Sequence, residues 1–141
     1  MTYTLVDHAE RIARLAHGDQ TDKSGGPYIG HPQRVAARVQ GEVAKAVAWL
    51  HDVIEDTHLD AQDLINAGIP GFVVETVKIL THTRYEPNET YWWRIRTNDL
   101  ARQVKLADIA DNTDPERLEA LDPATRERLT KKYARALEVL G

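Results

Sequence analysis

AVAWLHDVIEDT, residues 46–57, is an apolar stretch that ends in one histidine and three acidic residues. Carboxylates at the end of an apolar helix repel one another and resist burial, and a divalent cation would offset that repulsion. The stretch therefore predicts a buried helix that carries a polar site at its carboxyl end. The apolar positions recur at the spacing of one helical stripe, formed by Val43, Val47, Leu50 and Ile54.

Histidine and acidic residues elsewhere in the chain can complete this polar site. His31 lies in PYIGHP, residues 27–32, after a glycine-bearing loop, and Asp108 lies in VKLADIADN, residues 104–112. Two imidazoles and two carboxylates form the mixed nitrogen and oxygen donor set that suits a borderline or hard divalent cation. The set predicts a metal-dependent hydrolase. Its expected metal ligands are His31, His51, Asp52 and Asp108.

Helical spacing also places further polar groups beside these ligands, because residues four apart share a helix face. The alternative is a solvated acidic helix end with an incidental histidine, which is the usual explanation of an isolated His-Asp dipeptide. Here the dipeptide follows an apolar helix and has partners in two other segments, and this favours the metal site. The expected pairs on shared faces are His51 with Glu55, Asp52 with Asp56, and Asp108 with Asn112.

Length and composition restrict the class of protein. The chain has 141 residues, so residues 1–141 are expected to form one domain with one core. A formal net charge of −4 argues against a nucleic-acid partner, which requires clustered Lys and Arg. The absence of cysteine excludes disulfides and thiolate zinc sites and fits a reducing cytoplasm.

No secretory signal is visible, and no stretch approaches the roughly eighteen apolar residues that cross a membrane. We therefore expect a cytoplasmic protein without membrane association.

Helical periodicity recurs along the chain while strand alternation is almost absent, so we predict an all-α fold. Pro32 is expected to open a helix that stops near Gly41. Residues 20–30, the longest polar stretch with glycines, are expected to form an ordered surface loop. Three later helix starts are predicted at the N-cap residues Asn88, Asp114 and Asp122.

Three segments carry a resemblance to a known family: AHGDQTDKSGGPYIGHPQRVA at residues 16–36, AWLHDVIEDT at residues 48–57 and VKLADIADN at residues 104–112. In this order they resemble the HD-domain metal-dependent phosphohydrolases. Within that superfamily they are most similar to the (p)ppGpp (alarmone) hydrolases, which remove the 3′-pyrophosphate from guanosine tetra- and pentaphosphate. The resemblance implies a compact HD-domain helical bundle that hydrolyses a small phosphorylated nucleotide.

The resemblance also implies roles for individual residues. It places the metal ligands on the four residues inferred above and implies manganese as the cation. The catalytic carboxylates correspond to Glu55 and Asp56, which would orient the attacking water and handle its proton. Lys23 and Asn112 correspond to positions near the nucleotide. Tyr28 completes the expected substrate-binding set, and its chemistry allows either stacking on the base or anchoring of its loop.

Two departures from the family pattern keep other substrates in consideration. Asp22 stands where the family normally has arginine, and IADNTDP follows where the family has a basic sequence. An acidic residue beside a polyphosphate is repulsive unless it is turned away or bridged by metal. A second hypothesis is therefore an HD-type enzyme for another small phosphate ester, such as a nucleoside 5′-monophosphate or a nicotinamide dinucleotide phosphate. A third is a nucleotide-binding regulatory module without turnover. The sequence leaves the oligomeric state open.

The basic C-terminal stretch TRERLTKKYARA, residues 125–136, has a simpler interpretation. Its apolar residues continue a helical stripe to Leu137 and Leu140, so its charged residues are expected on a solvated face. We therefore predict a helix that closes the bundle and forms no anion site.

Overall fold

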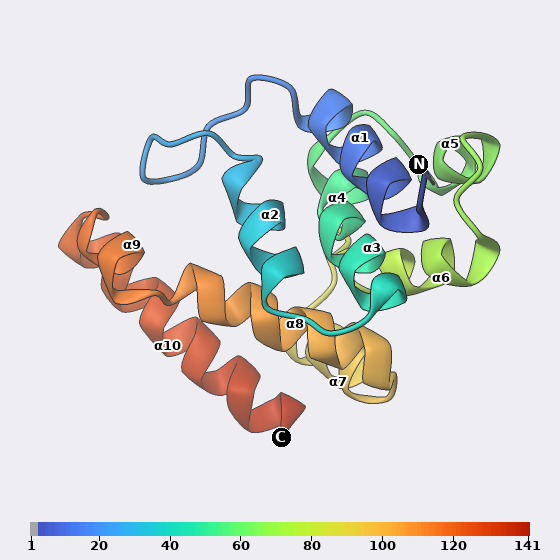
Figure 1. Ribbon diagram of the computed structural model, residues 1–141. Helices are drawn as coiled ribbons and strands as arrows, with labels where there is room; N and C mark the ends of the chain where they lie inside the picture. The colour runs from blue at the N-terminus through green and yellow to red at the C-terminus, as the bar shows by residue number, and fades with distance from the viewer. Residues whose placement is uncertain (1–2) are drawn as a thin grey trace.

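Helices make up the regular structure of residues 3–141, the part of the chain that the computed structural model describes (Figure 1). The predicted all-α fold is confirmed: within these residues the only extended pairing is an isolated bridge between Thr21 and Pro27. No helix of this part is both long and apolar enough to cross a membrane. In chain order the helices are α1 (Leu5–His17), α2 (Gly30–Ala37), α3 (Glu42–Leu50), α4 (Val53–Asp56), α5 (Ala61–Asn66), α6 (Gly71–Ile79), α7 (Asn88–Arg96), α8 (Asp99–Asn112), α9 (Pro115–Glu119) and α10 (Pro123–Leu140).

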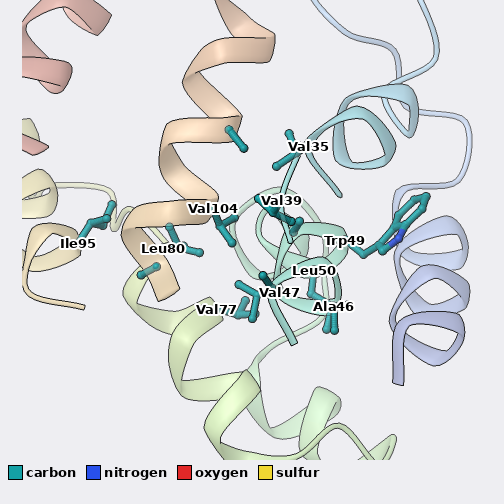
Figure 2. Close-up of a cluster of buried hydrophobic side chains, with 14 of the residues drawn as sticks. Val35, Val39, Ala46, Val47, Trp49, Leu50, Val77, Leu80, Ile95 and Val104 are labelled. Carbon is teal, nitrogen blue, oxygen red and sulfur yellow. The ribbon is translucent and has the colours of Figure 1, made fainter. Parts of the chain in front are cut away.

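Helix α3 forms the centre of the core because its second half is apolar on every side. All residues from Ala46 to Leu50 are buried, as expected of a helix without a polar face. Helices α1, α2, α6 and α8 each contact α3. Figure 2 shows Val47 beside Val77 of α6 and close to Val104 of α8. Among the described residues, buried side chains from every helix except α9 form one hydrophobic cluster.

Capping residues explain several helix starts. The side chains of Asp114 and Asp122 accept the amide N–H groups of Glu116 and Thr125, and a proline follows each cap. An aspartate cap satisfies an amide that lacks a helical partner, and proline at the next position lacks the amide that would otherwise be unpaired. These two predicted starts are confirmed.

Two other boundaries differ from the sequence-based predictions. Helix α2 begins at Gly30, before Pro32, because turns closed by Pro27 and Tyr28 carbonyls already shape the backbone there. Proline is tolerated in a first helical turn, where its missing N–H is not needed. Asn88 is the first residue of α7, and Pro87 occupies the cap position.

The stretch that we expected to form one helix is divided in two. Helix α3 ends at Leu50, and Ile54 belongs to the separate four-residue helix α4. The polar residues His51 and Asp52 form the joint between them. The expected continuous stripe from Val43 to Ile54 is therefore corrected.

Helix α8 brings the distant parts of the polar site together. It lies between α2 and α10 in Figure 1 and also contacts α3. Through these contacts Asp108 reaches His31 and His51, which are 77 and 57 residues away in the sequence. The packing of α8 therefore decides whether the predicted metal site forms.

Replacement of Leu50 by alanine tests the role of α3. Leu50 is fully buried, so Leu50→Ala is expected to lower the free energy of unfolding by about 2–5 kcal/mol through lost burial and a cavity. Urea denaturation followed by circular dichroism measures this change. Leu15→Ala is the matched control, because Leu15 is 74% exposed and its replacement should cost about 0.5 kcal/mol or less. Equal losses in both variants would contradict the central position of α3.

Candidate metal centre and active site

Four side chains from different segments converge in the interior. One ligand atom from each lies within 4.8 Å of the ligand atoms of the others. Their positions in the chain are His31 in α2, His51 directly after α3, Asp52 directly before α4, and Asp108 in α8. The structure thus brings together all the residues that the sequence predicts as metal ligands.

The joint between α3 and α4 explains how neighbouring residues serve one site. Adjacent residues of a continuous helix do not face each other. At this joint, however, His51 Nε2 lies 3.1 Å from Asp52 Oδ2. The Asp52 carbonyl still accepts the Asp56 amide at 2.9 Å, so one helical turn keeps these two residues on the same face, as the four-residue spacing predicts.

Hydrogen bonds on the outer side of both imidazole rings aim their inner nitrogens at the cluster. His51 Nδ1 lies 2.6 Å from the Ala48 carbonyl, and His31 Nδ1 lies 2.7 Å from Asp111 Oδ2. Both partners are acceptors, so each Nδ1 carries the proton. A histidine that binds metal usually donates its other N–H in this way. The two Nε2 atoms are left to face Asp108 Oδ1, at 2.8 Å from His31 and 3.3 Å from His51.

Opposite charges offset the cost of burying this cluster. Burial disfavours the charged form of His51, but Asp52 and Asp108 outweigh burial and hold its pKa well above the ordinary value. Burial likewise opposes ionisation of Asp108, but Lys105 and the two histidines hold its pKa well below the ordinary value. The protonated histidines thus balance the carboxylates. Because a histidine ligand must be neutral, binding of a cation displaces these protons.

The donor chemistry fits a divalent cation. Two imidazole nitrogens and two carboxylate oxygens suit borderline and hard metal ions, and both rings already present Nε2 to the same point. Without a metal, the protonated histidines balance the negative charge of the carboxylates. A divalent cation at this point would supply that positive charge instead. The cluster is therefore a candidate site for a divalent metal.

Glu55 and Asp56 lie beside this cluster and face a cavity of about 600 Å³. Carboxylate oxygens of both residues and of Asp52 lie within 4.8 Å of one another. Burial raises the pKa of Glu55, although a 2.7 Å hydrogen bond from the His82 amide opposes the rise. Burial and the Asp52 charge also raise the pKa of Asp56. Carboxylates with raised pKa values are suited to accept and return protons.

Tyr28 contacts the carboxylates through its hydroxyl group. The hydroxyl donates to Asp52 and lies 3.2 Å from Asp56 Oδ2, and the ring lies against His17 with 4.8 Å between centroids. Burial and the Asp52 charge raise the pKa of Tyr28, so the hydroxyl keeps its proton. The side chain also lines the cavity, where its predicted contact with substrate stays a prediction.

The other two expected substrate-binding residues line the same cavity. Lys23 lies on the loop between α1 and α2 and is exposed. Asn112 lies one turn after Asp108 in α8, and its Nδ2 donates to Asp108 Oδ1 at 3.2 Å, which confirms the expected shared face. Both side chains are placed where a ligand in the cavity would meet them.

Asp22 lines the cavity, but its carboxylate is engaged by its own loop and by Arg117. Its Oδ1 accepts the amides of Ser24 and Gly26, both at 2.9 Å, and its Oδ2 lies 3.5 Å from Arg117 Nη2. The carboxylate therefore shapes its own loop and faces a cation. The repulsion of a polyphosphate by Asp22, which supported a different substrate, is reduced by this arrangement.

Sequence reasoning missed Asp111 and the arginines around it. Asp111 is 1% exposed, accepts from His31, and binds Arg34 at 2.8 Å and Arg117 at 2.6 Å. Burial opposes its ionisation, but the hydrogen bonds from His31 and Arg34 lower its pKa to about 2. Asp111 could have been identified from the sequence, because it lies three residues after Asp108 on the same helix and therefore on the same face.

The prediction for the C-terminal helix is corrected at one residue. Lys132 of α10 lines the cavity instead of lying on a solvated face. Tyr133 also lines the cavity, but it packs against the core as the apolar stripe predicts. Helix α10 packs on α7 and α8, and this contact places its middle over the opening. Helical periodicity identifies an apolar stripe but does not reveal which neighbouring element lies beside it.

The chain resembles proteins named for ppGpp hydrolysis, although no family model matches it. The guanosine-3′,5′-bis(diphosphate) 3′-pyrophosphohydrolase of Haemophilus influenzae is 35% identical over 135 residues, which cover 86% of this chain and 20% of that protein. The bifunctional (p)ppGpp synthase/hydrolase SpoT of Escherichia coli is 43% identical over 74 residues, which cover 45% of this chain and 10% of that protein.

A solved structure shares the fold. It is a metazoan orthologue of SpoT described as hydrolysing ppGpp, with a TM-score of 0.78 and 22% identity over 99% of this chain and 88% of that one. This chain is similar to the alarmone hydrolases in sequence and in fold. The predicted resemblance and the predicted HD-type helical bundle are confirmed. The chain spans about a fifth of the length of the Haemophilus relative and about a tenth of the length of the Escherichia coli relative.

Loss of one carboxylate ligand should abolish metal binding. Asp52→Asn removes the charge of a predicted ligand, so we expect manganese to stabilise the wild-type chain and to leave this variant unchanged. At about 100 times the dissociation constant, a bound ion adds about 2.7 kcal/mol, or roughly 5–10 °C in Tm. Thermal melting with and without manganese measures the shift. Asp99→Asn, at an exposed position on α8, is the control and should keep the full shift.

The Tyr28 hydroxyl should strengthen metal binding by orienting Asp52. Tyr28→Phe removes this donor and keeps the ring, and loss of such an outer hydrogen bond weakens metal affinity by about tenfold or more. Isothermal titration with manganese measures the affinity. Tyr85→Phe is the control because Tyr85 is 87% exposed. Unchanged affinity in Tyr28→Phe would show that the hydroxyl does not orient the ligand.

Proposed function

We propose that this chain is a metal-dependent phosphohydrolase that releases the 3′-pyrophosphate of guanosine 3′,5′-bis(diphosphate) or a closely related nucleotide. The observation that carries the proposal is the position of Glu55 and Asp56 beside the converging donors and on the wall of the cavity. The names of the relatives support the substrate class.

We propose manganese as the cation, with His31, His51, Asp52 and Asp108 as its ligands. When bound, such a cation polarises a phosphoryl oxygen and lowers the pKa of water. The chain itself supplies the orientation of the ligands: Ala48 and Asp111 hold the two rings, and Tyr28 holds the Asp52 carboxylate.

Glu55 is the proposed proton acceptor for the attacking water. One of its oxygens accepts the His82 amide, which fixes the direction of the carboxylate. Its raised pKa allows it to hold a proton for the length of the reaction and to return it to the leaving group. Asp56 shares its environment and binds the Tyr28 hydroxyl, so it would orient the water from a second side.

The cavity supports a nucleotide as the ligand. Its volume of about 600 Å³ lies in the range of small-molecule sites, and its walls combine aromatic, cationic and acidic side chains. We propose that Lys23, Tyr28 and Asn112 contact the substrate there. Nucleic acid and membrane partners are not proposed. We further propose that the protein acts in the cytoplasm and that residues 1–141 form one domain, which the single hydrophobic cluster supports.

The alternative hypotheses have weaker support. The case for another phosphate ester depended on repulsion by Asp22, and that carboxylate faces Arg117 and its own loop. A binding module without turnover has no chemical need for Glu55 and Asp56 beside the donor cluster. Alarmone hydrolysis is therefore the function that the geometry supports best.

Neutralisation of Glu55 should separate catalysis from metal binding. Glu55→Gln keeps the shape of the side chain but cannot accept a proton, so we expect kcat to fall by roughly 100-fold or more while manganese still stabilises the protein. Pyrophosphate release from guanosine 3′,5′-bis(diphosphate) measures turnover. Glu75→Gln is the control, since the Glu75 side chain is 68% exposed on α6.

A substrate and metal panel completes this test. Pyrophosphate release should stop on addition of EDTA and return with manganese. Much faster hydrolysis of a nucleoside 5′-monophosphate would favour the second hypothesis. Nucleotide binding without any hydrolysis in the manganese-loaded protein would favour the regulatory module.

A further inference from the structure

Four lysine and arginine side chains line the cavity, and only two of them form ion pairs with carboxylates of the described residues. Lys105 and Arg117 are both held by carboxylates, Lys105 by Asp108 at 2.9 Å and Arg117 by Asp111 at 2.6 Å. Within residues 3–141, neither Lys23 nor Lys132 makes an ion pair or a side-chain hydrogen bond. These two lysines line the same cavity as the donor cluster.

Lys132 is in an environment that disfavours its charge. It is half-buried on α10, and its Nζ lies 5.4 Å from the centroid of the Tyr133 ring. Burial is the main cause that lowers its pKa, and the positive charges of Lys105 and Lys23 lower it further, although the Asp108 charge partly opposes them. Like charges repel one another, and an anion that binds near them would relieve that repulsion.

The two lysines and the donor cluster come from different elements. Lys23 lies on the loop between α1 and α2, and Lys132 lies on α10, whereas the metal donors belong to α2, the α3–α4 joint and α8. Two sets of groups therefore line the cavity, and we call them its two walls: candidate metal ligands with further carboxylates, and two ammonium groups without an ion-pair partner in the described part of the chain. A ligand that binds to both walls at once therefore needs two anionic groups, one for each wall.

We propose that Lys132, together with Lys23, forms a second anion subsite that binds the phosphate chain that is not hydrolysed. The inference rests on the proposed function, in which the 3′-diphosphate lies at the donor cluster and the 5′-diphosphate extends toward the lysines. Lys132 is then a specificity-determining residue: it selects nucleotides that are phosphorylated at two positions. A nucleoside monophosphate has one anionic group and leaves one wall unpaired.

The first experiment measures binding without chemistry. Guanosine 5′-diphosphate carries the proposed second anion and no 3′-phosphate, and omission of metal keeps it from binding through a cation. In isothermal titration with the full chain, Lys132→Gln should bind it about tenfold more weakly than the wild type, as expected for loss of one charge-assisted hydrogen bond. Lys131→Gln is the matched control, because the neighbouring Lys131 side chain is 76% exposed and pairs with Glu127. Equal affinity of the wild type and Lys132→Gln would overturn the subsite.

The second experiment measures selectivity in the manganese-loaded enzyme. For guanosine 3′,5′-bis(diphosphate), Lys132→Gln should raise KM about tenfold and leave kcat unchanged, because the lost contact is the same in the bound substrate and the transition state. For guanosine 3′-diphosphate, which lacks the 5′-phosphates, KM should not change. Equal losses with both substrates would contradict the assignment of Lys132.

The two proposals fail in different ways. If the wild type hydrolyses neither substrate, the proposed function is wrong, and the titration with guanosine 5′-diphosphate still decides the subsite. If the wild type hydrolyses both substrates with the same kcat/KM, the function stands and the subsite is wrong. Thermal melting of each variant verifies that the substitutions leave the fold intact.

Discussion

The buried carboxylate of Asp108 is the interaction on which the rest of the site depends. Its side chain is about 7% exposed, and it contacts His31, His51 and Lys105 at 2.8, 3.3 and 2.9 Å. A carboxylate can occupy such a position only when charged or hydrogen-bonding partners replace water. Docking of α8 against α2 and α3 therefore requires these polar partners as well as apolar contacts.

His31 links this carboxylate to a second one on the same helix. Its ring lies between Asp108 and Asp111, with 2.8 and 2.7 Å from its two nitrogens to the carboxylate oxygens. Asp111 is balanced in turn by Arg34 and Arg117, and Arg117 extends to Asp22 on the loop between α1 and α2. The orientation of the His31 ring is thus coupled to the loop between α1 and α2 and to α9, which both border the cavity.

Charge is distributed unevenly around the cavity, and this matters for function. The acidic wall contains Asp52, Glu55, Asp56 and Asp108, while Lys23 and Lys132 contribute positive charge without acidic partners among the described residues. A divalent cation and a polyanionic nucleotide together would neutralise both walls. The pairing of Asp22 with Arg117 reduces the repulsion between this acidic residue and a phosphorylated ligand.

The sequence alone determined the helical class and the core helix, and it predicted which four residues could bind a metal, because periodicity and residue chemistry are local properties. The tertiary structure decided what depends on contacts between distant segments. The break at His51, the contact of Tyr28 with Asp52 and the place of Lys132 on the cavity all follow from how the helices pack. An apolar stripe shows which face of a helix is buried, but the neighbour that covers it is chosen by the packing of the whole chain.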